Sequence, residues 1–240
     1  MLTACLNGAR RGFERAPVTV AELAAAAAGA VAAGAGAVHV HPRDDVGEQT
    51  LDPDLVALTV TAIRAAVPGV PVGVTTVADI APDPRTRVSL VRRWPAPADG
   101  GPDAASVNWH EPGAVEVAGT LRARGIAVEA GLLTPRAAAA FVGSRWPWQV
   151  GRVLVEAVPG HTPGGFGVWA AERILAALGP QPAAVLVHGE EQWAWPVLRW
   201  AQEQGYDTRI GLEDTLVDER GRRVDDTAQL VRAALSGRPS

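Results

Sequence analysis

Two histidines and a late glutamate are the residues whose types and spacing best fit metal chemistry. His39 and His41 stand two apart in AVHVHPRDD, and Glu213 lies far along the chain in RIGLEDT. Residues two apart on a strand share a face, so both imidazoles can reach one ion. Two histidines and a carboxylate are ligands of catalytic zinc. We therefore predict a divalent metal site, with zinc as the ion; the alternative is ordinary polar residues at a strand end, with Glu213 and Asp214 paired to Arg209.

The basic residues narrow the possible chemistry. All 22 are arginine, and the chain contains no lysine. Schiff-base catalysis needs a lysine amine, and so does the phosphate-binding lysine of a P-loop. The formal charge of −4 gives no basic footprint for nucleic acid. These classes of mechanism and partner are therefore excluded.

The remaining composition is that of a core-forming globular chain. Hydrophobic residues make up 48% and charged residues 20%. Cys5 is the only cysteine, which leaves no intrachain disulfide or cysteine-based zinc cluster. Residues 23–37 are mostly alanine, glycine and valine, too weakly apolar and too short for a membrane span, and the N-terminus lacks a signal-peptide pattern. We expect a cytoplasmic protein without membrane or nucleic-acid partners.

Short apolar runs alternate with longer helical patterns along the whole chain. The predicted strands are Leu2–Asn7, Ala37–Arg43, Pro71–Val77, Ala104–Trp109, Ala127–Leu133, Val150–Pro159, Ala183–Gly189 and Asp207–Asp214. The predicted helices are Thr19–Gly34, with Thr19 and Glu22 at capping-box spacing, and Pro53–Val67, Pro84–Trp94, Ala114–Gly125, Pro135–Ser144, Gly167–Gly179, Trp195–Gly205 and Asp225–Ser236.

This alternation predicts an α/β protein, a single (β/α)8 TIM barrel with parallel strands over residues 1–240. An open doubly wound sheet is the alternative, but no GxGxxG opens the first helix. Active sites of such barrels lie at the C-terminal ends of the strands. Only the first strand would separate the second from the eighth, so Glu213 can reach the ion held by His39 and His41.

Several segments resemble one enzyme family over nearly the whole chain. They are LNGA, AGAxAVHVHPRD, ASVN, RIGLED and a late helix containing AQLV, in that order. They are similar to the β-keto acid cleavage enzymes, the family of 3-keto-5-aminohexanoate cleavage enzyme. The resemblance implies a zinc-dependent (β/α)8 barrel that acts as an acyltransferase. Such an enzyme converts a β-keto acid and acetyl-CoA to a new acyl-CoA and acetoacetate.

The resemblance also implies roles for individual residues. Asp214 matches the catalytic acid/base, Arg209 the arginine that orients it, and Thr75 a small hydroxyl residue near that pair. The metal ligands it implies are His39, His41 and Glu213. Around the substrate we expect Ser106, Asn108, Arg10, Arg43 and His188.

The chain departs from the family pattern at three positions. Arg10 and Gly131 stand where a glutamate is expected, although Glu129 remains two residues before Gly131. His188 stands where a small residue is expected. An ammonium group on the substrate needs carboxylates nearby, so we expect a substrate with a further acid group or a neutral acyl chain instead.

Two other functions remain open from the sequence. A metal-dependent hydrolase of the amidohydrolase type also carries HxH, usually on the first strand. A non-catalytic metal-binding relative would fit the missing glutamates. Arg10, Arg11 and the glycine-rich segment 159–167 are candidates for contacting CoA phosphates, and eight tryptophans are compatible with a homo-oligomer.

Overall fold

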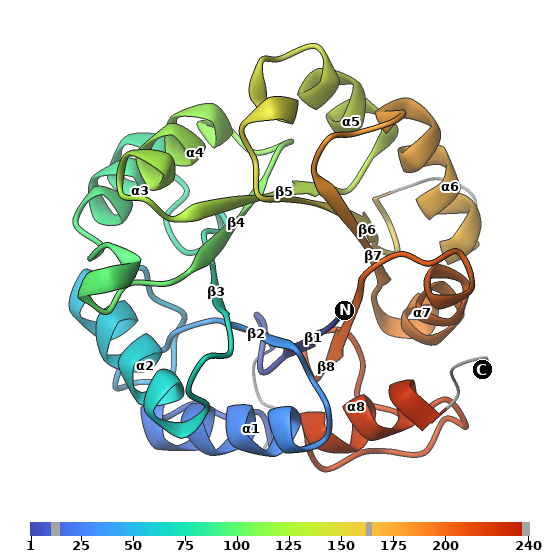
Figure 1. The fold of residues 1–240 in the computed structure, drawn as a ribbon, viewed down its shortest axis with the longest axis horizontal. Helices are drawn as coiled ribbons and strands as arrows, with labels where there is room; N and C mark the ends of the chain where they lie inside the picture. The colour runs from blue at the N-terminus through green and yellow to red at the C-terminus, as the bar shows by residue number, and fades with distance from the viewer. Residues whose placement is uncertain (11–14, 162–164, 237–240) are drawn as a thin grey trace.

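The computed structural model describes residues 1–10, 15–161 and 165–236, and within them eight parallel strands form a ring (Figure 1). Neighbouring strands follow the order β7-β6-β5-β4-β3-β2-β1-β8. A parallel bridge from Leu186 to Asp207 nearly closes the ring between its two ends. The strands are β1 Leu2–Cys5, β2 Ala37–Val40, β3 Val72–Thr75, β4 Ala104–Asn108, β5 Ala127–Leu132, β6 Arg152–Ala157, β7 Ala184–Gly189 and β8 Thr208–Gly211.

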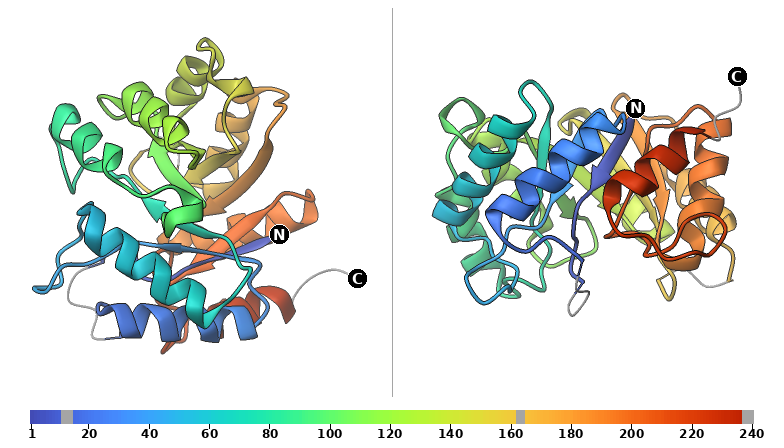
Figure 2. Two further views of the ribbon diagram at one scale, coloured as in Figure 1. Left: turned by 60° about the vertical axis from the view of Figure 1, so that its left-hand side comes forward. Right: turned by 90° about the horizontal axis from the view of Figure 1, so that it is seen from below.

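Eight α-helices surround the strands (Figures 1 and 2). They are α1 Val20–Ala32, α2 Pro53–Ala66, α3 Pro84–Arg92, α4 Ala114–Ala123, α5 Pro135–Val142, α6 Gly167–Leu178, α7 Ala194–Glu203 and α8 Thr227–Ser236. The capping box between Thr19 and Glu22 is present. The (β/α)8 barrel is confirmed, and the open doubly wound sheet is excluded. In the described part of the chain, every helix is too short or too polar to cross a membrane.

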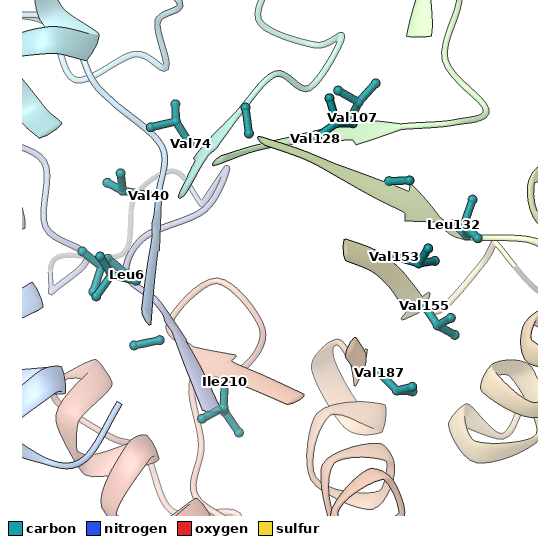
Figure 3. Close-up of a cluster of buried hydrophobic side chains, with 14 of the residues drawn as sticks. Leu6, Val40, Val74, Val107, Val128, Leu132, Val153, Val155, Val187 and Ile210 are labelled. Atoms are coloured by element: carbon teal, nitrogen blue, oxygen red, sulfur yellow. The ribbon is translucent and has the colours of Figure 1, made fainter. Parts of the chain in front are cut away.

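The two faces of each strand have different environments. Val40, Val74, Val107, Val153 and Ile210 point away from the barrel axis and pack in the layer beneath the helices (Figure 3). Because side chains alternate along a strand, residues between them face the barrel interior.

The barrel interior holds charged side chains. Buried Glu129 of β5 and partly buried Arg152 of β6 form an ion pair inside the ring, through an Nε–Oε1 hydrogen bond of 2.9 Å and a second bond from Nη2. Glu129 is thus a structural partner of Arg152 and is not part of the described cavity lining.

The second and eighth strands are shorter than predicted. β2 ends at Val40 and β8 at Gly211, so His41 and Glu213 lie in the loops that follow. The prediction that both strands continue to Arg43 and Asp214 was wrong. After β8 the chain turns, because the N–H groups of Asp214 and Thr215 both donate to the carbonyl of Gly211.

Candidate metal centre and active site

A cavity of about 520 Å³ opens at the C-terminal end of the barrel. It lies where parallel-barrel enzymes bind their substrates. Its described lining includes eight of the predicted site residues: Arg10, His39, His41, Thr75, Ser106, Asn108, Arg209 and Glu213. Arg43, His188 and Asp214 are not part of that lining.

The three predicted metal ligands converge in this cavity. His39, His41 and Glu213 each offer a ligand atom within 4.8 Å of the others. His41 Nε2 lies 3.6 Å from Glu213 Oε1, and the two imidazole rings meet edge to face with centroids 5.3 Å apart. The strand and the loop together therefore bring the two imidazoles to one point, although only His39 is within β2.

The chemistry of these side chains fits a zinc ion. His41 Nδ1 contacts Gln49 Oε1 at 2.5 Å, which leaves Nε2 directed toward Glu213. Metal-binding histidines usually donate the N–H of their second ring nitrogen to an acceptor that fixes the ring, and the Gln49 oxygen can take that part here. Burial lowers the pKa of His39 to about 3, which keeps the imidazole neutral, as a ligand must be. Glu213 Oε2 is buried without a hydrogen-bond partner among the described residues.

The LNGA segment builds this centre through the backbone. The Asn7 side chain accepts a hydrogen bond from His41 N–H at 2.9 Å and donates one to the His41 carbonyl at 2.9 Å. Gly8 has φ +56°, and a β-carbon there would overlap the side chain of Glu213. Asn7 therefore holds the residue that leaves β2, and Gly8 makes room for the third ligand.

Arg209 connects the metal ligand to the predicted acid/base. Its Nη2 donates to Glu213 Oε1 at 2.9 Å and its Nε to Asp214 Oδ1 at 3.1 Å. Burial opposes ionisation of Glu213, but Arg209 and then His41 and His39 lower the pKa of this carboxyl well below its usual range. One guanidinium thus fixes two adjacent carboxylates. Asp214 is fully buried, and its Oδ2 has no hydrogen-bond partner among the described residues.

The predicted polar residues on β3 and β4 also face the cavity. Thr75 and Ser106 are neighbours in the register of the two strands. Thr75 Oγ1 accepts a hydrogen bond from Val77 N–H at 3.1 Å. Asn108 Nδ2 donates to Glu111 Oε1 at 2.9 Å. These three predicted residues can therefore present hydroxyl and amide groups to a bound molecule.

The two predicted substrate arginines are engaged by the protein itself. Arg10 donates to the Leu212 carbonyl at 2.6 Å and to Glu191 Oε1 at 2.8 Å. Arg43 donates to the carbonyls of Gly8 and Gly47, which ties two loops together. The contacts of Arg10, and that of Arg43 with Gly8, join segments distant in sequence. Arg11 and residues 162–164, which we predicted as possible CoA contacts, lie outside the described residues.

His188 lies behind the cavity between two carboxylates. Its Nε2 is 3.2 Å from Glu156 Oε2 and its Nδ1 is 3.4 Å from Asp214 Oδ1. Burial and Arg209 lower the pKa of His188, but the interactions with Asp214 and Glu156 outweigh them and raise it to about 9. His188, Glu190 and Asp214 could geometrically hold a second ion. A protonated His188 beside the Arg209 guanidinium makes that group a poor cation site.

Glu156 and Glu190 are among the cavity carboxylates that the sequence did not predict. Glu156 ends the apolar run VLVE, and a charged residue inside an apolar strand was the available signal. Glu190 follows β7, and burial raises the pKa of its carboxyl to about 7. Both line the cavity. Glu156 lies across it from the predicted metal centre, and Glu190 lies near Arg209.

The (β/α)8 architecture and the convergence of His39, His41, Glu213 and Arg209 place a candidate metal site at the mouth of a TIM barrel. The sequence matches the model of the family described as beta-keto acid cleavage enzyme over residues 1–236. The chain belongs to the beta-keto acid cleavage enzyme family. This membership favours C–C cleavage over the amidohydrolase-type hydrolase. No curated protein matches the chain in sequence.

Solved structures share the fold at low sequence identity. A complex of ObcA with oxaloacetate has a TM-score of 0.70 and 15% identity over 92% of this chain. A ternary complex of ObcA with a C4-CoA adduct and oxalate has a TM-score of 0.71, also at 15% identity and 92% coverage. This chain spans 63% of the length of both ObcA chains. The N-acetylmannosamine-6-phosphate 2-epimerase from Clostridium perfringens has a TM-score of 0.60 at 12% identity, covering 89% of this chain and 87% of its own.

Proposed function

We propose that this protein transfers the acyl part of a β-keto acid to CoA, using acetyl-CoA and releasing acetoacetate, with a zinc ion held by His39, His41 and Glu213. The observation that carries the proposal is the convergence of these three ligands within 4.8 Å, with Arg209 joined to both Glu213 and Asp214. Membership of the family supports the reaction class. The ObcA complexes with oxaloacetate and with a C4-CoA adduct support a keto acid and a CoA ester as reactants.

The metal would polarise the keto and carboxylate oxygens of the bound acid and so acidify the carbon between them. Asp214 takes the proton from that carbon, and Arg209 holds Asp214 in place. Because Asp214 is fully buried, a small movement of its side chain or of the turn after β8 must bring it to the substrate. Thr75, Ser106 and Asn108, on the nearby strands β3 and β4, orient the acid.

The bonds and protons of this reaction balance without a further reactant. The deprotonated carbon attacks the thioester of acetyl-CoA, so a C–C bond forms and the C–S bond breaks to release CoA thiolate. The thiolate then attacks the original keto carbon. The bond between that carbon and the carbon that Asp214 deprotonated breaks. The products are a new acyl-CoA and acetoacetate, which recovers the proton held by Asp214. No lysine is needed, in keeping with the composition.

The test is a screen of β-keto acids with acetyl-CoA in which new acyl-CoA is measured by mass spectrometry. We expect product with zinc-loaded protein, none after chelation, and recovery when zinc is restored. Asp214→Asn should reduce turnover by at least about a hundredfold, within the range that general acid–base groups contribute. The zinc content of that variant should equal that of the wild type.

Two results would overturn the proposal. Turnover that is indifferent to zinc removal would exclude the metal centre, and full activity of Asp214→Asn would exclude its role as base. Binding of keto acids without acyl-CoA formation would favour a non-catalytic relative. Hydrolysis of amides or lactones without CoA would favour the hydrolase.

A further inference from the structure

Glu156 is a buried carboxylate with a hydrogen-bond partner on only one of its two oxygens among the described residues. Its Oε2 lies 3.2 Å from His188 Nε2. Its Oε1 is buried and has no hydrogen-bond partner among the described residues, although Glu156 lines the cavity. Leaving a buried charged acceptor unpaired is costly. The free oxygen is therefore suited to a partner that enters the cavity from outside.

Gly131 leaves the space in which this oxygen lies. A β-carbon on Gly131 would overlap Glu156 Oε1 and would come within 2.6 Å of Asn108 Oδ1. Gly131 is the β5 position where the sequence analysis noted a missing glutamate. In this chain the carboxylate of the neighbouring strand β6 fills the space above it. The absence of a side chain at Gly131 on β5 therefore makes room for the glutamate on β6.

His188 fixes the orientation and the charge of Glu156. The two residues are opposite each other in the register of β6 and β7. Burial opposes the charged form of Glu156, but the hydrogen bond and the charge of His188 lower the pKa of its carboxyl. An ionised carboxylate paired with a cation is a weak base, so it is better suited to accepting a hydrogen bond than to removing a proton from carbon.

The position of Glu156 indicates which part of a substrate it meets. Strands β3, β4 and β5 separate β2 from β6 on one side of the ring, and β1, β8 and β7 separate them on the other (Figure 1). Glu156 therefore faces the metal centre from across the barrel mouth. If the carboxylate and keto oxygen of a keto acid were bound at His39 and His41, its acyl chain could extend across the cavity toward Glu156.

We propose that Glu156 determines substrate specificity by accepting a hydrogen bond from a hydroxyl or ammonium group on the acyl chain of the β-keto acid. This inference rests on the proposed function for the orientation of the substrate. It replaces the expectation from Arg10 of a further acid group or a neutral chain. Arg10 is occupied by Glu191 and the Leu212 carbonyl, whereas Glu156 has a free acceptor.

The test uses four β-keto acids of equal chain length that end in a methyl, a hydroxyl, an ammonium or a carboxylate group. For zinc-loaded wild type, kcat/KM for the better donor-ended acid should exceed that for the methyl-ended acid by about ten- to a hundredfold. The hydroxyl and ammonium arms identify which donor is used. Titration calorimetry with the same four acids, without acetyl-CoA, measures the preference independently of turnover.

Two variants address Glu156 differently. Glu156→Gln removes the charge, and Gly131→Ala keeps the charge but displaces the oxygen. Both should lower the donor-to-methyl ratio by about tenfold. The matched control is Glu203→Gln, which removes an exposed carboxylate at the end of α7, outside the described cavity lining; it should leave the ratio unchanged. Circular dichroism and unfolding midpoints verify that each variant is folded.

The outcomes separate this inference from the proposed function. Acyl-CoA formation with no preference for a donor, or a ratio unchanged in both variants, overturns the inference and leaves the function intact. Preference for the carboxylate-ended acid also overturns it. A donor preference in binding that both variants lose, without any acyl-CoA formed, supports the inference and overturns the proposed function.

Discussion

The two sides of the cavity are built from different kinds of contact. On the side of β1 and β2, side chains hold the backbone, as when Asn7 binds both polar groups of His41. On the side of β5, β6 and β7, side chains hold other side chains, as when His188 binds Glu156 over the space left by Gly131. The first kind fixes where the chain turns, and the second fixes charge. Mutations should therefore displace ligands on one side and alter charge and recognition on the other.

The largest effect is expected from Gly8→Ala on the metal side. The new β-carbon would occupy the space of Glu213, and φ +56° disfavours alanine. Strain and overlap together should weaken zinc binding on the order of a thousandfold, about 4 kcal/mol, measured by competition with a chelator.

Gly69→Ala is the matched control for this substitution. Gly69 has φ +79°, but its added β-carbon would meet nothing within 4 Å. Gly69→Ala therefore introduces the backbone strain without displacing Glu213, so a comparison of the two variants distinguishes these effects. If Gly8→Ala retains wild-type zinc affinity, the close approach does not position the ligand.

Asn7→Ala should destabilise the fold by about 3 kcal/mol, because it leaves the buried N–H and carbonyl of His41 without partners. The measurement is the free energy of unfolding in urea. Thr3→Val on β1 is the control, since the Thr3 hydroxyl is buried without a hydrogen bond in the described structure and its removal should cost little. An equal loss of unfolding free energy in both variants would show that the Asn7 hydrogen bonds to His41 contribute no more than the Thr3 hydroxyl.

The opposite side should give the protein a pH-dependent stability. The pKa of His188 is raised to about 9 in the fold, against about 6.5 in an unfolded chain. Its contribution is fully present below pH of about 6.5 and is lost as pH rises through about 9, an effect of roughly 3 kcal/mol. Urea unfolding of metal-free protein across this window measures it.

His188→Gln should flatten that pH dependence, whereas His110→Gln, which removes an exposed loop histidine, should not. A slope that persists in His188→Gln would assign the effect to another group. Such a result would mean that the charge on His188 does not distinguish this side of the cavity from the other.

The smallest effect concerns the outer partner of a metal ligand. Gln49→Ala removes the contact to His41 Nδ1 and should weaken zinc binding by about tenfold. Gln204→Ala, at an exposed position after α7, is the control. No change in zinc affinity would mean that Asn7 alone orients His41.

The fold was predictable because its local patterns agree with one another. Alternating apolar runs and helical periods gave all eight strands and helices, and the Thr19 capping box gave the start of α1. The ends of β2 and β8 were wrong, because a strand ends where its backbone loses partners. At the end of β2 the N–H of His41 binds Asn7, and after β8 the chain turns at Gly211. The pattern of apolar residues predicts neither contact.

The sequence by itself determined the barrel and the spacing of His39 and His41, and it predicted that Glu213 meets them, because each follows from residues close in the chain or from the order of strands. Only the tertiary structure showed that Arg10 and Arg43 form hydrogen bonds with other parts of the protein. It also showed that Glu156 faces the cavity in the space left by Gly131. These contacts depend on the register between strands and on the loops that meet above them. One sequence does not specify either, since a shift of one residue turns a side chain to the opposite face.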